Sequence, residues 1–166
     1  MSERLREDPD PSHEHALRLS LYETIASRRA TYDTMLWQAP VLSLTAQAFL
    51  FTIALGEGSS RLARLLAGAL ALITALGSMQ LMGKQRFHEQ VDSRLLALHE
   101  RTTGLADVIG TPMHGPMNER VTAAGLVRPW YAKPSSYKLW MVILASFAVA
   151  AFVVILVTWL HPQLLQ

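Results

Sequence analysis

The 166-residue sequence has no cysteine, which excludes disulfide bonds, thiol nucleophiles and zinc–thiolate sites. Charged residues are also scarce: they make up 17% of the chain, against about 25% in an average soluble domain. The formal net charge of +2 is too small to indicate nucleic-acid binding by itself. The first fifteen residues have no apolar stretch followed by a small-residue cleavage site, so we expect no signal peptide.

Three long runs of the chain have almost no charge. Residues 139–160 form one apolar run, residues 35–56 are uncharged, and residues 61–83 are charged only at Arg61 and Arg64. A helix of about 22 residues extends about 33 Å, which is enough to cross the hydrocarbon core of a bilayer. The sequence therefore predicts an all-α integral membrane protein with three transmembrane helices plus amphipathic cytoplasmic helices.

The positions of lysine and arginine predict how these spans are oriented. Five of the 15 precede the first span, eight lie between the second and third spans, and two lie at the start of the second span. Because basic residues concentrate in cytoplasmic segments, we expect a cytoplasmic N-terminus and an external C-terminus. An odd number of spans requires the same arrangement.

We therefore divide the chain into four segments. Residues 1–34 form a cytoplasmic amphipathic helix, 35–83 a transmembrane hairpin, 84–135 a cytoplasmic helical extension with a Gly/Pro-rich linker, and 136–166 the third span with an external tail. Both cytoplasmic helices have apolar residues at helical spacing. We expect these stripes to pack against each other or against neighbouring subunits: Leu17, Leu21, Ile25, Tyr32 and Leu36 on the first, and Phe87, Val91, Leu95 and Leu98 on the second.

Polar side chains inside the spans are the first candidates for function, because polar groups in lipid need a partner or water. Ser43 and Gln47 share a face of the first span, and Thr74 and Ser78 share a face of the second. Two interpretations stay open: these residues serve helix packing, or they line a pore. Since three helices cannot enclose a pore, the second interpretation requires an oligomer. An apolar gate that closes by dewetting is then expected at Leu44 or Phe51.

Basic residues flank the predicted spans in two groups. Arg61 and Arg64 lie at the external mouth, where they either reach lipid headgroups or form a ring that selects anions. The second group lies near the cytoplasmic surface, where it binds either anionic lipid or the phosphates of a nucleotide or oligonucleotide. Its members are Arg28, Arg29, Lys84 and Arg86.

Signatures of catalysis are missing. The spans contain no Asp or Glu, and the chain has no Gly-rich phosphate loop and no Ser-His-Asp set. His88 and His99 are eleven residues apart, about 16 Å along a helix, which is too far for a shared metal ion. We therefore expect no enzyme, no metal site and no cofactor.

The order of elements resembles a known family. An amphipathic helix containing YETIASRRATYD leads into the close hairpin LWQAPVLSLTAQAFLFTIAL and LARLLAGALALITALGSMQLM, and the charged helix KQRFHEQVDSRLLALHE follows. Over residues 17–101 this resembles the SLATT-type small membrane effectors of bacterial antiviral defence, which include Hailong-like channel effectors. The resemblance implies an oligomeric pore in the bacterial inner membrane, controlled by a nucleotide-derived signal from a partner nucleotidyltransferase. The third span departs from the two-span plan of the family.

These observations lead to two candidate functions. The first is a homo-oligomeric ion channel, with a tetramer favoured, that acts as the effector of an anti-phage defence system. Its cytoplasmic helices would gate it in response to a nucleotide-derived ligand or a partner. The alternative is a non-conducting membrane anchor or regulatory subunit that recruits a cytoplasmic enzyme.

Overall fold

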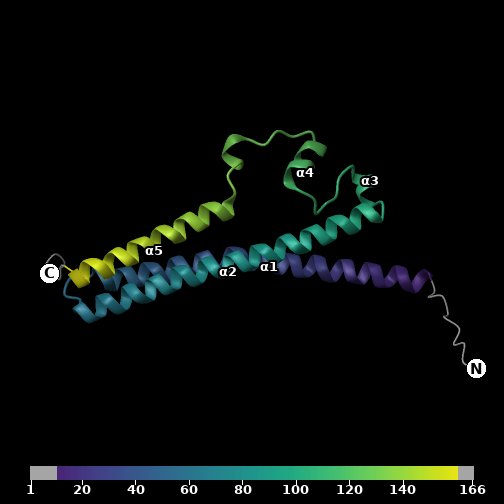
Figure 1. The fold of residues 1–166 in the computed structure, drawn as a ribbon. Coiled ribbons are helices and arrows are strands. Elements are labelled where there is room, and N and C mark those ends of the chain that lie inside the picture. Colours follow the sequence, from purple (N-terminus) through teal and green to yellow (C-terminus); the bar gives the residue numbers. More distant parts are fainter. Residues whose placement is uncertain (1–10, 161–166) are drawn as a thin grey trace, which may run out of the picture. The chain divides into compact units, whose positions relative to one another are not determined.

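The computed structural model describes residues 11–160. Residues 1–10 and 161–166, which include the start of the predicted cytoplasmic helix and the predicted external tail, lie outside the described residues. The described part is helical and has no strand. Its elements are α1 (Pro11–Leu55), α2 (Arg61–Thr102), α3 (Leu105–Ile109), α4 (Met117–Ala123), the 3₁₀ turn η1 (Trp130–Ala132) and α5 (Ser136–Leu160) (Figure 1).

Helices α1, α2 and α5 are long and apolar enough to cross a membrane, as the sequence predicts. Helix α5 has 25 residues, whereas α1 has 45 and α2 has 42. At 1.5 Å per residue α1 and α2 are each more than 60 Å long, about twice the hydrocarbon thickness of a bilayer. Each of them therefore joins an apolar segment to a polar segment within one continuous helix, and Pro40 lies inside α1.

A five-residue turn reverses the chain between α1 and α2. Gly58 has a φ of +77°, a left-handed conformation that glycine adopts without strain. The Ser60 hydroxyl accepts the backbone N–H of Ala63 at 3.1 Å and so caps the start of α2. The Ser59 hydroxyl donates to the Ile53 carbonyl at 2.7 Å, which satisfies an acceptor at the end of α1.

The chain forms two compact units. Within the described residues, the first unit comprises 11–31 and 89–126, and the second comprises 32–88 and 127–160. Helices α1 and α2 contribute to both units, α3 and α4 belong to the first, and α5 belongs to the second.

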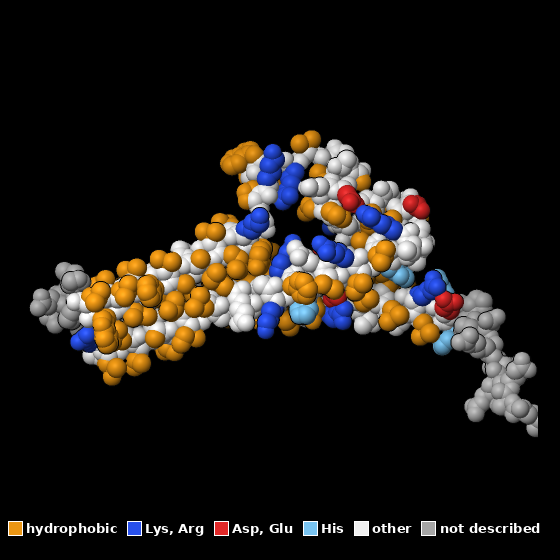
Figure 2. Space-filling view, in the orientation of Figure 1, with side chains coloured by type: hydrophobic (Ala, Val, Ile, Leu, Met, Phe, Trp, Pro, Cys, Tyr) orange, Lys and Arg blue, Asp and Glu red, His pale blue; other side chains and the backbone are white. Residues whose placement is uncertain are grey.

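The core of the second unit lies between α1, α2 and α5, which run side by side (Figure 1). Leu36, Met82 and Leu144 provide one buried side chain from each helix. Helix α5 packs closely on α2 at Gly68, where an added Cβ would lie 2.9 Å from Cγ1 of Ile155. On the face shown in Figure 2, hydrophobic side chains cover most of the surface of these three helices in the second unit.

In the first unit the apolar stripes predicted for α1 and α2 do not bury each other. Leu17 is 52% exposed on α1, while Leu95 and Leu98 are 46% and 60% exposed on α2. The face of α2 that is buried instead contains Asp92 and Glu100. The physical reason is that α1 meets α2 through ion pairs and hydrogen bonds, which turn the apolar face outward.

Candidate functional site

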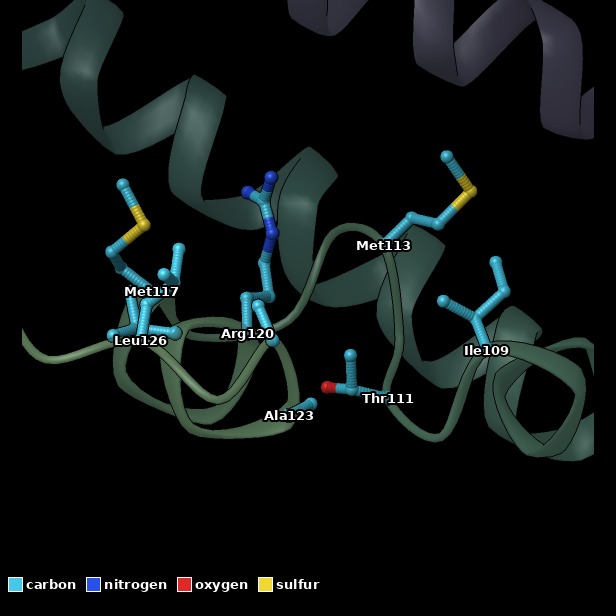
Figure 3. Close-up of a pocket in the computed structure, with 9 residues that line it drawn as sticks. Ile109, Thr111, Met113, Met117, Arg120, Ala123 and Leu126 are labelled. Atoms are coloured by element: carbon cyan, nitrogen blue, oxygen red, sulfur yellow. The ribbon is translucent and has the colours of Figure 1, made fainter.

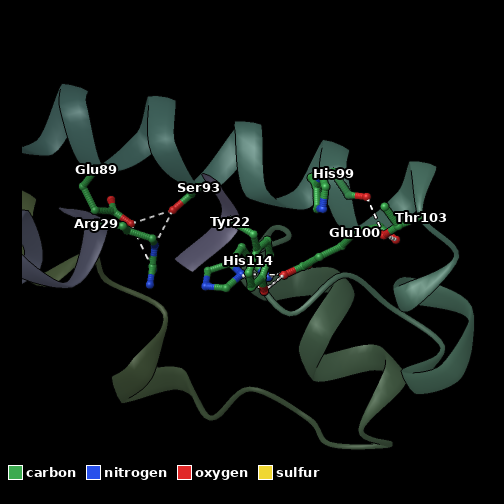
Figure 4. A network of polar contacts seen from close by, with 8 residues as sticks. All are labelled: Tyr22, Arg29, Glu89, Ser93, His99, Glu100, Thr103 and His114. Carbon is green, nitrogen blue, oxygen red and sulfur yellow. Dashed lines mark hydrogen bonds and ion pairs between the residues drawn. The ribbon is translucent and has the colours of Figure 1, made fainter. Parts of the chain in front are cut away.

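Two adjacent arginines of α1 hold α2 in the first unit. The Arg28 guanidinium donates to both carboxylate oxygens of Asp92, at 2.9 and 2.6 Å. Arg29 donates to Glu89 at 3.1 Å and to the Ser93 hydroxyl at 2.6 Å, and Ser93 donates in turn to Glu89 (Figure 4). Asp92 and Glu89 are buried, so these charge-assisted hydrogen bonds satisfy carboxylates that water does not reach.

A second polar cluster centres on Glu100, whose side chain is completely buried. The Tyr22 hydroxyl of α1 donates to Oε1 of Glu100 at 2.8 Å, and Nδ1 of His114 lies 2.6 Å from the same oxygen. The backbone N–H of His114 donates to Oε2 at 3.2 Å. The His99 ring lies beside Tyr22, with ring centroids 5.5 Å apart. Glu100 thereby joins α1, α2 and the loop that precedes α4 (Figure 4).

The environment of this cluster shifts two pKa values in opposite directions. Burial, together with the hydrogen bond to Glu100 and its charge, raises the pKa of Tyr22 to about 12. Burial alone would raise the pKa of Glu100, but the hydrogen bonds from His114 and Tyr22 outweigh it, so the pKa of Glu100 is lowered. The cluster therefore favours an ionised carboxylate facing a neutral phenol at neutral pH.

A pocket of about 380 Å³ lies between α3 and α4 in the first unit (Figure 3). Its walls are mostly apolar, with Ile109, Met113 and Met117 among them, and Arg120 supplies one cation. The Thr111 hydroxyl oxygen is buried and has no hydrogen-bond partner among the described residues. The pocket thus has the size and the apolar lining of a small-molecule site.

The residues predicted to line a pore differ in burial within the second unit. Ser43 and Gln47 are buried, and the Gln47 amide donates to the Ala71 carbonyl of α2 at 2.7 Å. Thr74 and Ser78 are half-buried. Ser43 and Gln47 therefore belong to the contact between α1 and α2 within one subunit, and their role in a pore stays a prediction.

The two predicted gate residues are partly buried in the second unit, and Phe51 contacts another helix of the same subunit. Leu44 and Phe51 are half-buried. The ring of Phe51 packs against Phe147 of α5, with centroids 5.9 Å apart. As gate residues of an oligomer, both stay predictions.

Arg61 and Arg64 satisfy carbonyls at the ends of other helices. Arg61 donates to the Trp159 carbonyl at 3.2 Å, and its guanidinium carbon lies 5.8 Å from the centroid of the Trp159 ring. Arg64 is 8% exposed and donates to the Gly56 carbonyl, just past the end of α1, at 3.3 Å. Cations at helix C-termini are favourable because the last carbonyls carry partial negative charge.

The four residues predicted to bind phosphate belong to different units, two to each. Arg28 and Arg29 pair with carboxylates of α2 in the first unit, as described above. Lys84 is exposed and Arg86 half-buried, and both lie on the part of α2 in the second unit. A phosphate ligand of Arg28 or Arg29 would therefore have to compete with Asp92 or Glu89.

The outer face of α1 has a polar row whose regular spacing the sequence interpretation did not recognise. Gln38, Thr45 and Thr52 recur every seven residues and are all exposed. The hydroxyls of Thr45 and Thr52 donate to the carbonyls four residues earlier, at 3.1 and 2.8 Å. Their lone pairs remain free to accept hydrogen bonds from outside the helix. At 100° per residue this row lies opposite Gln47.

No protein-family profile, characterised protein sequence or solved structure matches this chain. Residues 11–160 also contain no group of three or more His, Cys, Asp or Glu side chains placed to hold a metal ion.

Sequence reasoning missed the Glu100 cluster and the polar row for different reasons. Tyr22 and Glu100 are 78 residues apart, so no local pattern connects them. The row could have been found, because threonine or glutamine at a spacing of seven is visible in the sequence. The earlier residues Thr24 and Thr31 continue the same spacing along α1.

Proposed function

We propose that this chain is an integral membrane protein that assembles into a homo-oligomeric channel, with the outer face of α1 toward the pore. The observation that carries the proposal is the exposed row of Gln38, Thr45 and Thr52 on a helix that is long and apolar enough to span a bilayer. The assembly would act as the effector of a bacterial defence system, as the resemblance to SLATT-type proteins implies.

The membrane part of the proposal follows from the composition of the second unit. Three helices carry apolar segments of spanning length, and large apolar side chains such as Leu42 and Val142 are 71% and 66% exposed. In water such a surface would aggregate, whereas hydrocarbon solvates it. The proposed spans are 35–55, 61–83 and 139–160, in the bacterial inner membrane, with the first unit in the cytoplasm.

The outer row argues for an oligomer. A glutamine amide that faces hydrocarbon lacks hydrogen-bond partners, and this is unfavourable. Further copies of α1, or water enclosed between them, would supply those partners. A spacing of seven keeps the row on one seam when helices supercoil with a left-handed twist, as in most bundles of parallel or antiparallel helices.

The first unit provides a second argument for self-association. Val91, Leu95 and Leu98 form an exposed apolar stripe on α2 because the polar face is used within the subunit. Contiguous exposed apolar residues outside a membrane mark an interaction surface. Copies of the same chain would bury this stripe in the oligomer.

We further propose that an anionic signal opens the channel by competing for Arg28 and Arg29. Phosphate oxygens match the planar guanidinium as well as carboxylates do. A nucleotide-derived ligand that displaced Asp92 or Glu89 would change how α1 meets α2. That contact is the element through which the cytoplasmic helices would act on the pore.

Single-cysteine variants test the pore directly, because the natural chain has no cysteine. We expect a membrane-impermeant thiol reagent to reduce single-channel current in planar bilayers for Gln38→Cys, Thr45→Cys and Thr52→Cys. Val149→Cys, on an exposed face of α5, is the lipid-facing control and should not respond. Block at Ser43→Cys and Gln47→Cys, but not at the outer row, would contradict this orientation of α1.

The alternative function is a non-conducting anchor whose first unit recruits a cytoplasmic enzyme. The same apolar stripe of Val91, Leu95 and Leu98 favours it, since a soluble partner could cover the stripe. The two functions differ in the mass of the purified particle and in conductance. A silent monomer in detergent supports the anchor, and a stable oligomer with single-channel steps supports the channel.

A further inference from the structure

The short segment that leads into α5 exposes large side chains. Val127, Trp130 and Tyr131 are 92%, 80% and 71% exposed. The turn η1 holds the two aromatic residues in place, because the Ala132 N–H donates to the Pro129 carbonyl at 3.0 Å. The two rings lie edge to face, with centroids 6.0 Å apart. An ordered turn thus presents two aromatic rings outward.

The charge of this segment is entirely positive. Arg128, Lys133 and Lys138 lie between or beside the exposed aromatic residues, and the sequence has no Asp or Glu after Glu119. Figure 2 shows hydrophobic and basic side chains next to one another over this segment. A ligand that suits this surface therefore packs against aromatic rings and carries negative charge.

Lipid headgroups meet both conditions. Tryptophan and tyrosine prefer the boundary between hydrocarbon and water, and lysine and arginine reach from there to phosphates. Protein interfaces are also enriched in tryptophan, tyrosine and arginine, but they are depleted in lysine, and this segment contains Lys133 and Lys138. The segment is also continuous with a proposed span, because α5 begins at Ser136 and Lys138 lies in its first turn.

We propose that residues 127–138 form an interfacial anchor that lies in the headgroup layer and binds anionic phospholipid. This inference rests on the proposed membrane function, because it needs α5 to enter the bilayer. The anchor would fix the depth of the cytoplasmic end of α5. Arg128, Lys133 and Lys138 would each strengthen the attraction to an anionic surface about fivefold.

Tryptophan fluorescence in vesicles tests the anchor. A variant with Trp37, Trp140 and Trp159 changed to Phe keeps only Trp130 as the reporter. In phosphatidylcholine vesicles that contain phosphatidylglycerol, we expect blue-shifted emission and quenching by lipids brominated near the headgroup. Lipids brominated deep in the acyl chain should quench less. Quenching should increase with the phosphatidylglycerol fraction.

The same vesicles separate failure of the anchor from failure of the membrane proposal. A variant that keeps only Trp159 reports on the other end of α5. Quenching of Trp159 without quenching of Trp130 would overturn the anchor and leave the span intact. If neither were quenched, the proposed function itself would fail. Blue-shifted but unquenched Trp130 emission would mean that protein covers the segment, which also overturns the anchor.

Two further variants test the role of charge without changing an aromatic residue. Changing Arg128, Lys133 and Lys138 together to Gln should abolish the dependence of Trp130 quenching on the phosphatidylglycerol fraction. Arg94→Gln, which removes an exposed cation on α2, should leave that dependence unchanged.

A nitroxide spin label at Tyr131→Cys, in the chain with all four tryptophans, measures the depth of the segment independently. If the spin label collided with a water-soluble relaxation agent as often as a label in an exposed loop does, the proposal would be contradicted.

Discussion

Glu100 links several segments of the first unit through hydrogen bonds. Its carboxylate is completely buried and accepts hydrogen bonds from groups on α1 and on the loop before α4. A buried carboxylate is stable only when such partners surround it. Removing the charge of Glu100 should therefore destabilise the contacts of residues that are distant from it in the sequence.

We predict that Glu100→Gln destabilises the first unit by about 2 kcal/mol, the usual contribution of hydrogen bonds to a charged group. Glutamine keeps only one accepting oxygen, so its NH₂ group would face either the Tyr22 hydroxyl or the backbone N–H of His114 and could accept a hydrogen bond from neither. Hydrogen exchange of residues 105–116 in detergent should become faster. Glu119→Gln is the control, because its pair with Arg101 is about half exposed and should matter little. Equal exchange in both variants would contradict this role of Glu100.

The shifted pKa values predict how stability changes at the two extremes of pH. Glu100 has its pKa lowered from 4.5, so its contribution is complete above that pH and is lost as the pH falls through the folded value. Tyr22 has its pKa raised from 10.0 to about 12, so its contribution is complete below pH 10 and is lost as the pH rises toward 12.

Ultraviolet difference absorbance can detect the ionisation of Tyr22. We expect one of the four tyrosines to ionise near pH 12, and Tyr22→Phe should remove that step. Tyr131→Phe changes an exposed tyrosine and should leave the step in place. The assignment would be wrong if the step persisted in Tyr22→Phe.

At the scale of elements, α1 and α2 meet through different chemistry in the two units. In the second unit the buried cluster that joins them is apolar and Gln47 adds a hydrogen bond, whereas in the first unit ion pairs and a hydrogen bond to Glu100 join them. Charged pairs fix the register of two helices because each cation has one matching carboxylate, whereas apolar faces can slide.

This polar contact can be tested by exchanging charges. Asp92→Arg should weaken the contact strongly, because it places a second cation opposite Arg28 in a buried site. The double variant with Arg28→Asp and Asp92→Arg should recover at least part of the lost thermal stability. The absence of any recovery would indicate that the two residues do not act as a pair.

Gly68 tests the contact between α2 and α5. Because a Cβ there would lie 2.9 Å from Ile155, we predict that Gly68→Leu lowers stability by roughly 1–3 kcal/mol through overpacking. Gly77→Leu is the matched control on the same helix, since nothing lies within 4 Å of its added Cβ. Melting of the detergent-solubilised variants compares them, and equal losses would contradict this packing.

The elements could be predicted from the sequence, whereas their contacts could not. Long uncharged runs identify α1, α2 and α5 because hydropathy is a local property. The spacing of Leu95 and Leu98 indicated an apolar face, but not that Asp92 and Glu100 on another face would make the contact. That outcome depends on partners such as Arg28 and Tyr22, which lie 64 and 78 residues away in the chain.

For the whole molecule, the distribution of charge and the three apolar helices together predict a membrane topology. The turn between α1 and α2 contains Glu57, and α4 contains Glu119. If all three helices cross the bilayer, these two exposed residues lie on opposite sides of the membrane. The functional proposals for the channel and for the anchor both require this arrangement.

Thiol labelling of sealed spheroplasts measures this topology most directly, using Glu57→Cys and Glu119→Cys in the cysteine-free chain. We predict that an impermeant maleimide labels Glu57→Cys in intact spheroplasts and labels Glu119→Cys only after lysis. Labelling of both variants from outside, or of neither before lysis, would contradict a chain that crosses the membrane three times.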